Sequence, residues 1–532
     1  MKDVNWQALS YMLIVLVGVV MLTTFLDYGV TLDEETQSIY GDNVLAWYGS
    51  FFRDRRALDF TFMYGGFFDA IAQLASRVLP FGVYESRHLV NCLFGLMAIV
   101  AAYKLGAHVG GAMAGFFSAL FLTITPVLYG HSFNNPKDIP FSTLCLISLY
   151  FILVSYRQLP RLPNNLVAKL GLSVGLAMGV RVGGMMLFGF LAALFLAWLI
   201  VQFRLKSPFL QLGVRKKTIL ALGLSAAFVV IISWVVMLAC WPWAQVKPLI
   251  DPFRALATFA RFDMRIKSFY DGEYILSFDL PWHYLPRWFS ISLPEFYFIS
   301  LLAGCGLACS FALKLKDDPA HLEKLINVLM LIGAAVLPIT TAILLRSPLY
   351  DAQRHFLFTI PPLAIVAAIS FASLLKARVH LLAKAGVSAM IAISAGLTVV
   401  DMVQLHPYEY VYFNRLIAGG LKAASQEFDT DYWGSSYKEG ADWVIDNYLL
   451  NTPERIRIAT CSSDFLTKHY FNRSEQLVKR FEPVDTHEDP SLLLATTRYQ
   501  CHERKWAKGK VLHIVERQGV PLLYVIELHS PQ

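Results

Sequence analysis

The fold is decided by residues 8–35, which read ALSYMLIVLVGVVMLTTFLDYGVTLDEE. The apolar run over residues 8–26 is long enough to cross a bilayer, and Asp33-Glu34 follow it within a few residues. A charged side chain near hydrocarbon costs several kcal/mol unless it faces water or a partner. We therefore interpret the pair as functional carboxylates at the mouth of a membrane bundle. The alternative is a solvated acidic cluster beside the membrane.

The composition predicts a polytopic membrane protein with a mostly α fold. Of the 532 residues, 56% are apolar and 16% are charged, against about half and about a quarter in soluble domains. Apolar runs of about 17–25 residues predict about eleven transmembrane helices, near residues 8–26, 89–106, 112–129, 139–156, 166–181, 183–203, 218–240, 292–313, 325–345, 356–375 and 385–402. The first run lacks a small-residue cleavage site, so we expect it to remain as an anchor rather than a signal peptide.

The basic residues of the short loops predict the orientation. Under this count one face collects Arg157, Arg161, Arg204, Lys206, Arg215, Lys216, Lys217, Lys314, Lys316, Lys376, Arg378 and Lys384. The positive-inside rule makes that face cytoplasmic, together with the N-terminus. The loops 27–86 and 241–291 and the tail then lie on the other face. The net charge of +7 mostly reflects this bias, so we expect no nucleic-acid partner.

We divide the chain into a membrane region, residues 1–405, and an extracytoplasmic α/β domain, residues 406–532. The sequence predicts a helix near 437–450, a strand near 456–460 and a hairpin that pairs 511–516 with 522–527 across Gln518-Gly519. Aromatic stretches at 406–410 and 431–434 are candidates for cradling a sugar or covering a cleft. Cys461 and Cys501 are the two cysteines of this domain, and an oxidising compartment permits a disulfide whose geometry the sequence leaves open.

Three further polar clusters fall on the outer face under this topology. The first is the loop 131–138, the second is Arg181 between two spans, and the third is the loop 347–355 before Pro361-Pro362. Arg87 opens the second span. Guanidinium groups match phosphate oxygens in a bidentate fork, so cations around an acidic pair indicate a site for an anionic headgroup. Interfacial helices near 40–48 and 60–79 would lie beside it.

These features together resemble the GT-C glycosyltransferases, in particular the protein O-mannosyltransferase and lipid A aminoarabinose transferase group. The ordered matches over residues 1–405 are Asp33-Glu34, a long first outer loop, Arg87, Asn135-Pro136-x-Asp138 and Arg354-His355 ahead of Pro361. Where many relatives carry His-Pro-Pro or Lys-Pro-Pro in the first outer loop, this chain has Tyr64-Gly65-Gly66, and His355 stands where a tyrosine commonly follows the arginine.

The resemblance implies an inverting transferase of the bacterial inner membrane, with a polyprenyl-phosphate sugar as donor and a lipid, glycan or protein as acceptor. Asp33 would be the general base. Glu34 would position the acceptor or hold a divalent cation with Asp33; no other cofactor is implied. The donor phosphate would be bound by Arg87, Arg181, Tyr350, Arg354 and His355. The acceptor and donor pocket would include Tyr64, His131, Asn134, Asn135, Lys137 and Asp138.

Two alternatives remain at this point. A secondary transporter would also have many spans and buried charges, but it should show paired halves and interrupted helices, and no convincing internal repeat is visible. The second alternative is a polyprenyl-diphosphate-dependent glycan transferase or ligase, which would need the same kind of site, with cations around an acidic pair.

Overall fold

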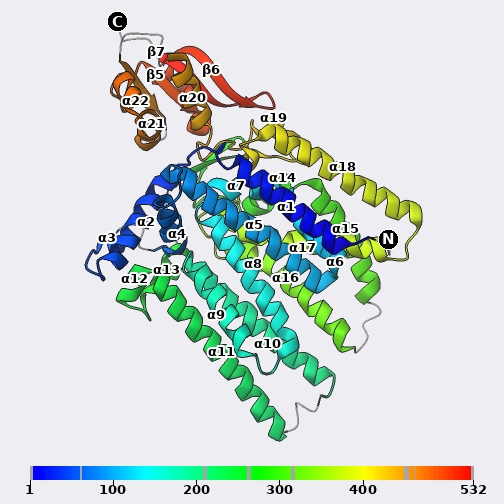
Figure 1. Ribbon diagram of the computed structural model, residues 1–532. Coiled ribbons are helices and arrows are strands. Elements are labelled where there is room, and N and C mark those ends of the chain that lie inside the picture. The colour runs from blue at the N-terminus through cyan, green and yellow to red at the C-terminus, as the bar shows by residue number, and fades with distance from the viewer. Residues whose placement is uncertain are drawn as a thin grey trace.

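The computed structural model describes residues 4–59, 63–207, 212–260, 265–312, 318–448, 455–461 and 463–528. Within this part of the chain the protein is a helical bundle with a small α/β domain at one end (Figure 1). The mostly helical membrane fold predicted from the sequence is confirmed.

The first half of the bundle is entirely helical in its described elements. Its helices are α1 (Trp6–Thr24), α2 (Glu34–Gly49), α3 (Arg56–Asp59), α4 (Phe67–Ser76), α5 (Val83–Gly110), α6 (Ala112–Thr123), α7 (Pro126–Asn134), α8 (Asp138–Ser155), η1 (Tyr156–Gln158), α9 (Asn164–Met178), η2 (Val182–Met185), α10 (Met186–Arg204) and α11 (Leu212–Cys240).

The second half adds one short hairpin to the helices. Its elements are α12 (Pro242–Val246), α13 (Asp251–Ala260), β1 (Lys267–Tyr270), β2 (Glu273–Leu276), α14 (Tyr284–Ser292), α15 (Glu295–Ala312), α16 (Pro319–Leu344), η4 (Arg354–Thr359), α17 (Ile360–Lys376) and α18 (Leu381–Leu405).

The number of spanning helices differs from the predicted eleven. Among the described residues, eight helices are long and apolar enough to cross a membrane, or up to ten if two bent pairs each count as one span. The bent pairs are α6 with α7, at 66°, and α14 with α15, at 105°. A proline stands at each break: Pro126 is the first residue of α7, and Pro294 precedes α15. The helices bend there because proline removes a helical hydrogen bond. The predicted fifth span is α9, which has only 15 residues.

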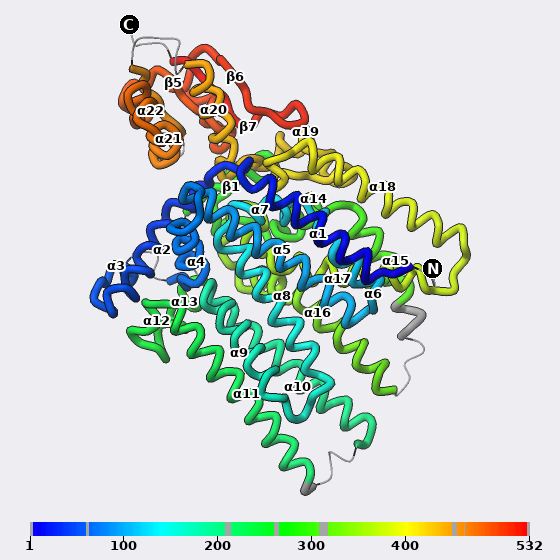
Figure 2. Tube along the Cα trace, in the orientation of Figure 1, coloured from blue at the N-terminus to red at the C-terminus, as the bar shows by residue number. Residues whose placement is uncertain are grey.

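The core of the bundle is formed by α5, α8 and α17, and other helices cover it. In their most apolar windows α8 and α17 are 78% buried inside the protein, whereas α1, α11 and α18 are only 22% buried. Apolar surface left exposed on long helices is what a lipid environment requires. The predicted interfacial segments form α2 and α4, which lie near α12 and α13 at one side of the bundle (Figure 2).

The C-terminal domain follows α18 and contains the elements predicted for it. They are η5 (Glu409–Val411), α19 (Gly420–Ala424), α20 (Tyr437–Tyr448), β3 (Ile456–Thr460), α21 (Asp464–Phe471), α22 (Glu475–Arg480), β4 (Phe481–Pro483), β5 (Leu492–Thr496), η6 (Arg498–Glu503), η7 (Lys505–Ala507), β6 (Gly509–Arg517) and β7 (Val520–Leu528).

The strands of this domain form one sheet with the order β4-β3-β5-β7-β6. The first three strands run parallel, and β7 pairs antiparallel with both β5 and β6. At the tip of the β6–β7 hairpin Gln518 and Gly519 both have positive φ, 52° and 73°, as the tight turns of hairpins require. The predicted hairpin is confirmed. Cys461 and Cys501 form a disulfide in this domain.

Candidate active site

The centre of the candidate site is an ion pair between Asp33 and Arg354. Asp33 is the N-cap of α2 and Arg354 is the first residue of η4. Nη1 of Arg354 donates to Oδ2 of Asp33 at 3.3 Å. The Arg354 side chain is 5% exposed, whereas that of Asp33 is 35% exposed and lines a cavity. Two residues predicted from separate outer loops therefore meet.

Arg354 is surrounded by two further carboxylates and two rings. Its Nη2 lies 2.9 Å from Oδ2 of Asp351, and its Nη1 lies 3.7 Å from Oδ2 of Asp138. The other oxygen of Asp138 is 2.5 Å from Nη2 of Arg181. The guanidinium also lies over the rings of Trp433, at 4.7 Å, and Tyr350, at 5.2 Å, within cation–π range. Three segments that are distant from Arg354 in sequence, around residues 33, 138 and 433, thus converge on it.

A cavity of about 470 Å³ opens beside this pair, and we call it the polar cavity because charged side chains line it. Its wall includes Asp33, Tyr64, Lys137, Arg354 and Trp433. The cavity therefore combines a partly exposed carboxylate with cations and aromatic faces. Such a combination suits a sugar, because ring faces cover its C–H surface while charged groups hydrogen-bond its hydroxyls.

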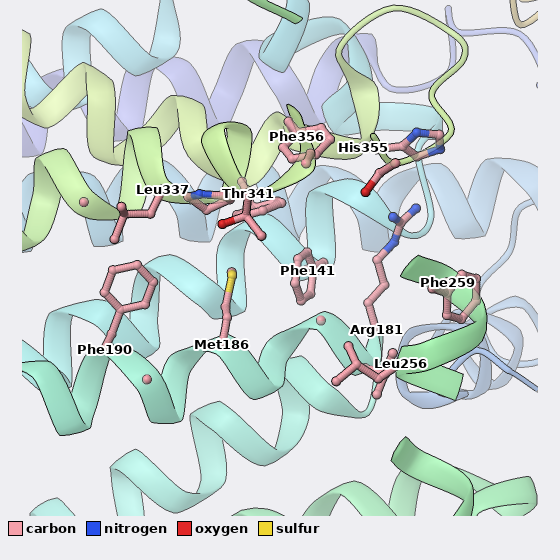
Figure 3. Close-up of a pocket in the computed structure, with 18 of the residues that line it drawn as sticks. Phe141, Arg181, Met186, Phe190, Leu256, Phe259, Leu337, Thr341, His355 and Phe356 are labelled. Carbon is pink, nitrogen blue, oxygen red and sulfur yellow. The ribbon is translucent and has the colours of Figure 1, made fainter. Parts of the chain in front are cut away.

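A second cavity, of about 710 Å³, is mainly apolar and runs between α10 and α16. Arg181 and His355 lie at one end and Phe190 and Leu337 at the other (Figure 3). The two cavities share wall residues Tyr64, Phe259 and Tyr350. An apolar channel with Arg181 at its end thus adjoins the polar cavity, which contains the Asp33 carboxylate.

Lys137 is held over the polar cavity by a relay that begins at Arg87. Lys137 Nζ lies 3.9 Å from the centre of the Tyr64 ring. With the Gln37 amide nitrogen facing Asp69, the Gln37 oxygen accepts from Lys137 at 2.6 Å and its nitrogen donates to Asp69 at 2.9 Å. Arg87 Nη2 in turn donates to Asp69 at 2.7 Å and is 1% exposed. Arg87 thus lies behind the cavity wall and reaches the site through two other residues.

The charges and burial around the cavity lower the pKa values of both Asp33 and Lys137. Burial raises the pKa of Asp33, but the charges of Arg354, Lys137, Arg498 and Arg181 outweigh it and bring that pKa below its usual value. Burial lowers the pKa of Lys137 to about 8, although Asp33 opposes the shift. Asp33 therefore carries a negative charge at neutral pH and can accept a proton.

Glu34 faces away from Asp33. Its Oε1 lies 3.0 Å from Nε2 of His88, and its Oε2 accepts from the backbone N–H of Thr31 at 2.8 Å. The side chain is 1% exposed, so Glu34 holds the start of α2 rather than facing the cavity. The two carboxylates do not converge on one point. In the part of the chain that the structure describes, no group of three or more His, Cys, Asp or Glu residues could hold a metal ion.

The remaining predicted residues lie behind the cavities. Asn135 donates to Asp138 at 3.0 Å and so fixes the carboxylate that pairs with Arg181. His131 hydrogen-bonds the Tyr432 hydroxyl at 3.0 Å. Asn134 donates to the carbonyl of Gly29 at 3.1 Å and anchors the chain that precedes α2. These three asparagine and histidine side chains support the site but do not line it.

Asp351, Gln37 and Arg498 also line the polar cavity, although no sequence pattern singled them out. Asp351 stands in the quoted loop 347–355 but carries no signal of its own. Gln37 is an ordinary polar residue on a helix. Arg498 comes from the soluble domain, where arginines are common on surfaces, so no sequence pattern distinguishes it.

Part of the chain is similar to a known protein family. A family described as dolichyl-phosphate-mannose-protein mannosyltransferase matches residues 67–237. The predicted resemblance is confirmed. The matched part runs from α4 into α11 and so includes Arg87 on α5, Asp138 on α8 and Arg181 just before η2. No curated protein matches the sequence closely enough to count as a relative.

Two solved structures are similar to the chain over most of its length. ArnT from Cupriavidus metallidurans bound to undecaprenyl phosphate is 15% identical with a TM-score of 0.49, and the match covers 98% of this chain and 99% of that one. The archaeal oligosaccharyltransferase AglB from Archaeoglobus fulgidus, in complex with an inhibitory peptide and a dolichol-phosphate, is 13% identical with a TM-score of 0.46. That match covers 92% of this chain and 69% of AglB.

Proposed function

We propose that this protein is a membrane glycosyltransferase that moves a sugar from a polyprenyl-phosphate donor to an acceptor on the extracytoplasmic face, with inversion at the anomeric carbon. The observation that carries the proposal is the junction of the two cavities, where an apolar channel with Arg181 at its end meets a pocket lined by Asp33, Lys137 and Arg354. The match of residues 67–237 to a mannosyltransferase family supports the same reaction class.

The shape of the apolar cavity suits a long isoprenoid chain. Its wall is formed by apolar residues of α10 and α16, among them Met186, Phe190 and Leu337. Burying such a chain is favourable by roughly 25 cal/mol per Å² of apolar surface. Arg181, Tyr350 and His355 at the polar end then lie where the phosphate that follows the chain would be placed.

The charges around the junction favour a donor with one phosphate over a diphosphate. The cations of the site already face carboxylates. Arg181, Arg354, Arg498 and Lys137 lie against Asp33, Asp138 and Asp351, and the charges of Asp69 and Asp429 also act on Lys137 and Arg498. A diphosphate would bring further negative charge into a buried site with no partner for it.

In the proposed reaction the acceptor oxygen attacks the anomeric carbon from the side opposite the phosphate. The new bond forms between that oxygen and the carbon, while the carbon–oxygen bond to the phosphate breaks and the polyprenyl phosphate leaves with the electron pair. Asp33 takes the proton of the acceptor. Arg354 and Arg181 stabilise the charge that grows on the leaving phosphate.

The donor itself would make Asp33 a stronger base. The low pKa of Asp33 arises from the cations around it, Arg354 and Lys137 foremost. A phosphate bound to those cations offsets part of their field, so the pKa of Asp33 rises toward the range in which a carboxylate accepts protons efficiently. Proton transfer is then favoured only when the donor is in place.

We place the site on the extracytoplasmic face of the inner membrane, with the N-terminus in the cytoplasm. The Cys461–Cys501 disulfide of the C-terminal domain supports this orientation, because disulfides persist in oxidising compartments. The basic loops of the opposite face agree with it.

The test is a transfer assay with the full-length protein in lipid nanodiscs. Polyprenyl-phosphate and polyprenyl-diphosphate sugars are offered with lipid, glycan and peptide acceptors, and the configuration of the product is read by NMR. We expect transfer from a monophosphate donor with inversion. Movement of a labelled substrate across a proteoliposome membrane without formation of a glycosidic bond would instead identify a transporter.

A further inference from the structure

One arginine of the C-terminal domain reaches the polar cavity of the membrane region. Arg498 is the first residue of η6 and lines the cavity that contains Asp33. Its Nη2 donates to Oδ1 of Asp351 at 2.7 Å, and its Nη1 donates to the carbonyl of Tyr432. The side chain is only 10% exposed, and its Nε has no hydrogen-bond partner among the described residues.

Asp351 transmits the position of Arg498 to Arg354. One oxygen of Asp351 accepts from Arg498, and the other accepts from Nε and Nη2 of Arg354 at 3.1 and 2.9 Å. Arg354 turns its remaining nitrogen, Nη1, toward Asp33 at 3.3 Å. Without Arg498, Asp351 would pair with Arg354 alone. Arg354 would then be less able to bind an anionic phosphate.

The segment that carries Arg498 is held by the Cys461–Cys501 disulfide. Cys461 follows β3 and Cys501 lies in η6, three residues after Arg498. Between Arg498 and Cys501, Tyr499 and Gln500 adopt positive φ values of 54° and 50°, which residues other than glycine rarely adopt. The disulfide thus ties an unusual backbone turn to the central sheet, and Cys501 is itself buried.

We propose that Arg498 is a positioning residue of the transfer site and that the Cys461–Cys501 disulfide holds it there, so that the site is complete only when the C-terminal domain is oxidised. This inference rests on the proposed transferase function. It assigns to the soluble domain a direct part in orienting Arg354 and makes transfer sensitive to the redox state of the compartment.

The test compares Arg498→Gln, Arg498→Lys, the pair Cys461→Ser with Cys501→Ser, and the triple variant that combines this pair with Arg498→Gln. The matched control is Arg504→Gln, because Arg504 is exposed on the same segment. All are full-length proteins in nanodiscs, and their melting temperatures are compared first. Transfer is measured as kcat and KM for the donor, and binding is measured with undecaprenyl phosphate alone.

We expect Arg498→Gln to raise the KM for the donor about tenfold, the size expected for one lost charge-assisted contact. Arg498→Lys should recover part of that loss and Arg504→Gln should behave as wild type. The cysteine pair should lose as much as Arg498→Gln, and the triple variant no more than either. A wild-type KM in Arg498→Gln, or losses that multiply in the triple variant, would overturn the proposal.

The binding measurement separates this inference from the proposed function. If the wild-type protein transfers no sugar, the function fails, but weaker binding of undecaprenyl phosphate to Arg498→Gln than to Arg504→Gln would still support the positioning role. Equal binding by the two variants would contradict it. If the cysteine pair fails to fold, the wild-type protein treated with a reductant takes its place, and unchanged donor affinity after reduction would contradict the disulfide's role.

Discussion

Asp33 lies 3.3 Å from Arg354 although 321 residues separate the two in sequence. Arg354 also contacts Asp138 and Asp351, so one guanidinium joins the start of α2, the start of α8 and the loop before η4. A carboxylate placed this way is ionised, partly exposed and next to a cation. It is thereby prepared both to accept a proton and to lie close to a bound phosphate.

Donor binding should weaken as the pH rises through the pKa of Lys137. That pKa is lowered to about 8, chiefly by burial, so Lys137 is charged at neutral pH and loses its charge as the pH rises. A sugar phosphodiester keeps its single charge over this range. We expect its affinity to fall several-fold between about pH 7 and about pH 9, as measured by titration calorimetry. Lys137→Arg should remove this dependence, and a flat profile in the wild type would contradict it.

Filling the apolar cavity should select against long donors. Gly189 lines this cavity, and an added Cβ there meets no atom within 4 Å. Gly189→Phe should therefore project its ring into the channel and raise the KM for a long-chain donor by about tenfold or more, since it displaces buried apolar surface. A short-chain donor should keep its KM. Gly223→Phe, also without neighbours within 4 Å, is the control, and equal effects of the two variants would argue against the channel.

Arg181 should contribute more to donor affinity than a cation near the other end of α10. Arg181 precedes α10 at the polar end of the apolar cavity and pairs with Asp138, whereas Lys206 is exposed beyond the other end of α10. Arg181→Gln should weaken binding of a polyprenyl phosphate about tenfold, and Lys206→Gln should leave it unchanged. Native mass spectrometry of the two variants with titrated lipid would decide. Unchanged affinity in Arg181→Gln would remove its phosphate role.

Gly65 allows the first outer loop to pack closely against the backbone of Gly179. A Cβ added to Gly65 would lie 2.0 Å from the carbonyl oxygen of Gly179, and that oxygen accepts from the N–H of Phe67 at 3.1 Å. Gly65→Ala should therefore force the first outer loop away from the bundle and destabilise the protein by ~1–3 kcal/mol. A thermal melt against Gly223→Ala provides the measurement. Equal melting temperatures would mean that the approach is not tight.

The sequence predicted those site residues that are charged and lie next to long apolar spans. Asp33, Arg181 and Arg354 were recognisable because charged groups near hydrocarbon are costly and rarely kept without a role, and their common face brought them together. Sequence could not separate Asp33 from Glu34. Consecutive residues at a helix start differ by about 100° in direction, so one carboxylate faces the cavity and the other is buried with His88.

Other features could not be predicted for equally physical reasons. The bends at Pro126 and Pro294 interrupt apolar runs whose length and composition predict continuous spanning helices. Arg87 acts through Asp69 and Gln37, a relay that depends on tertiary contacts alone. Arg498 comes from a soluble sheet domain whose docking against the bundle follows no local pattern.

The most direct test of the account is Asp33→Asn, which keeps the size and shape of the side chain and removes the base. We expect kcat to fall by about 10²–10⁴-fold, the usual contribution of a general base, while binding of the donor lipid stays within about threefold of wild type. Glu35→Gln, on the first turn of the same helix, should transfer normally. Wild-type turnover by Asp33→Asn would contradict the central claim.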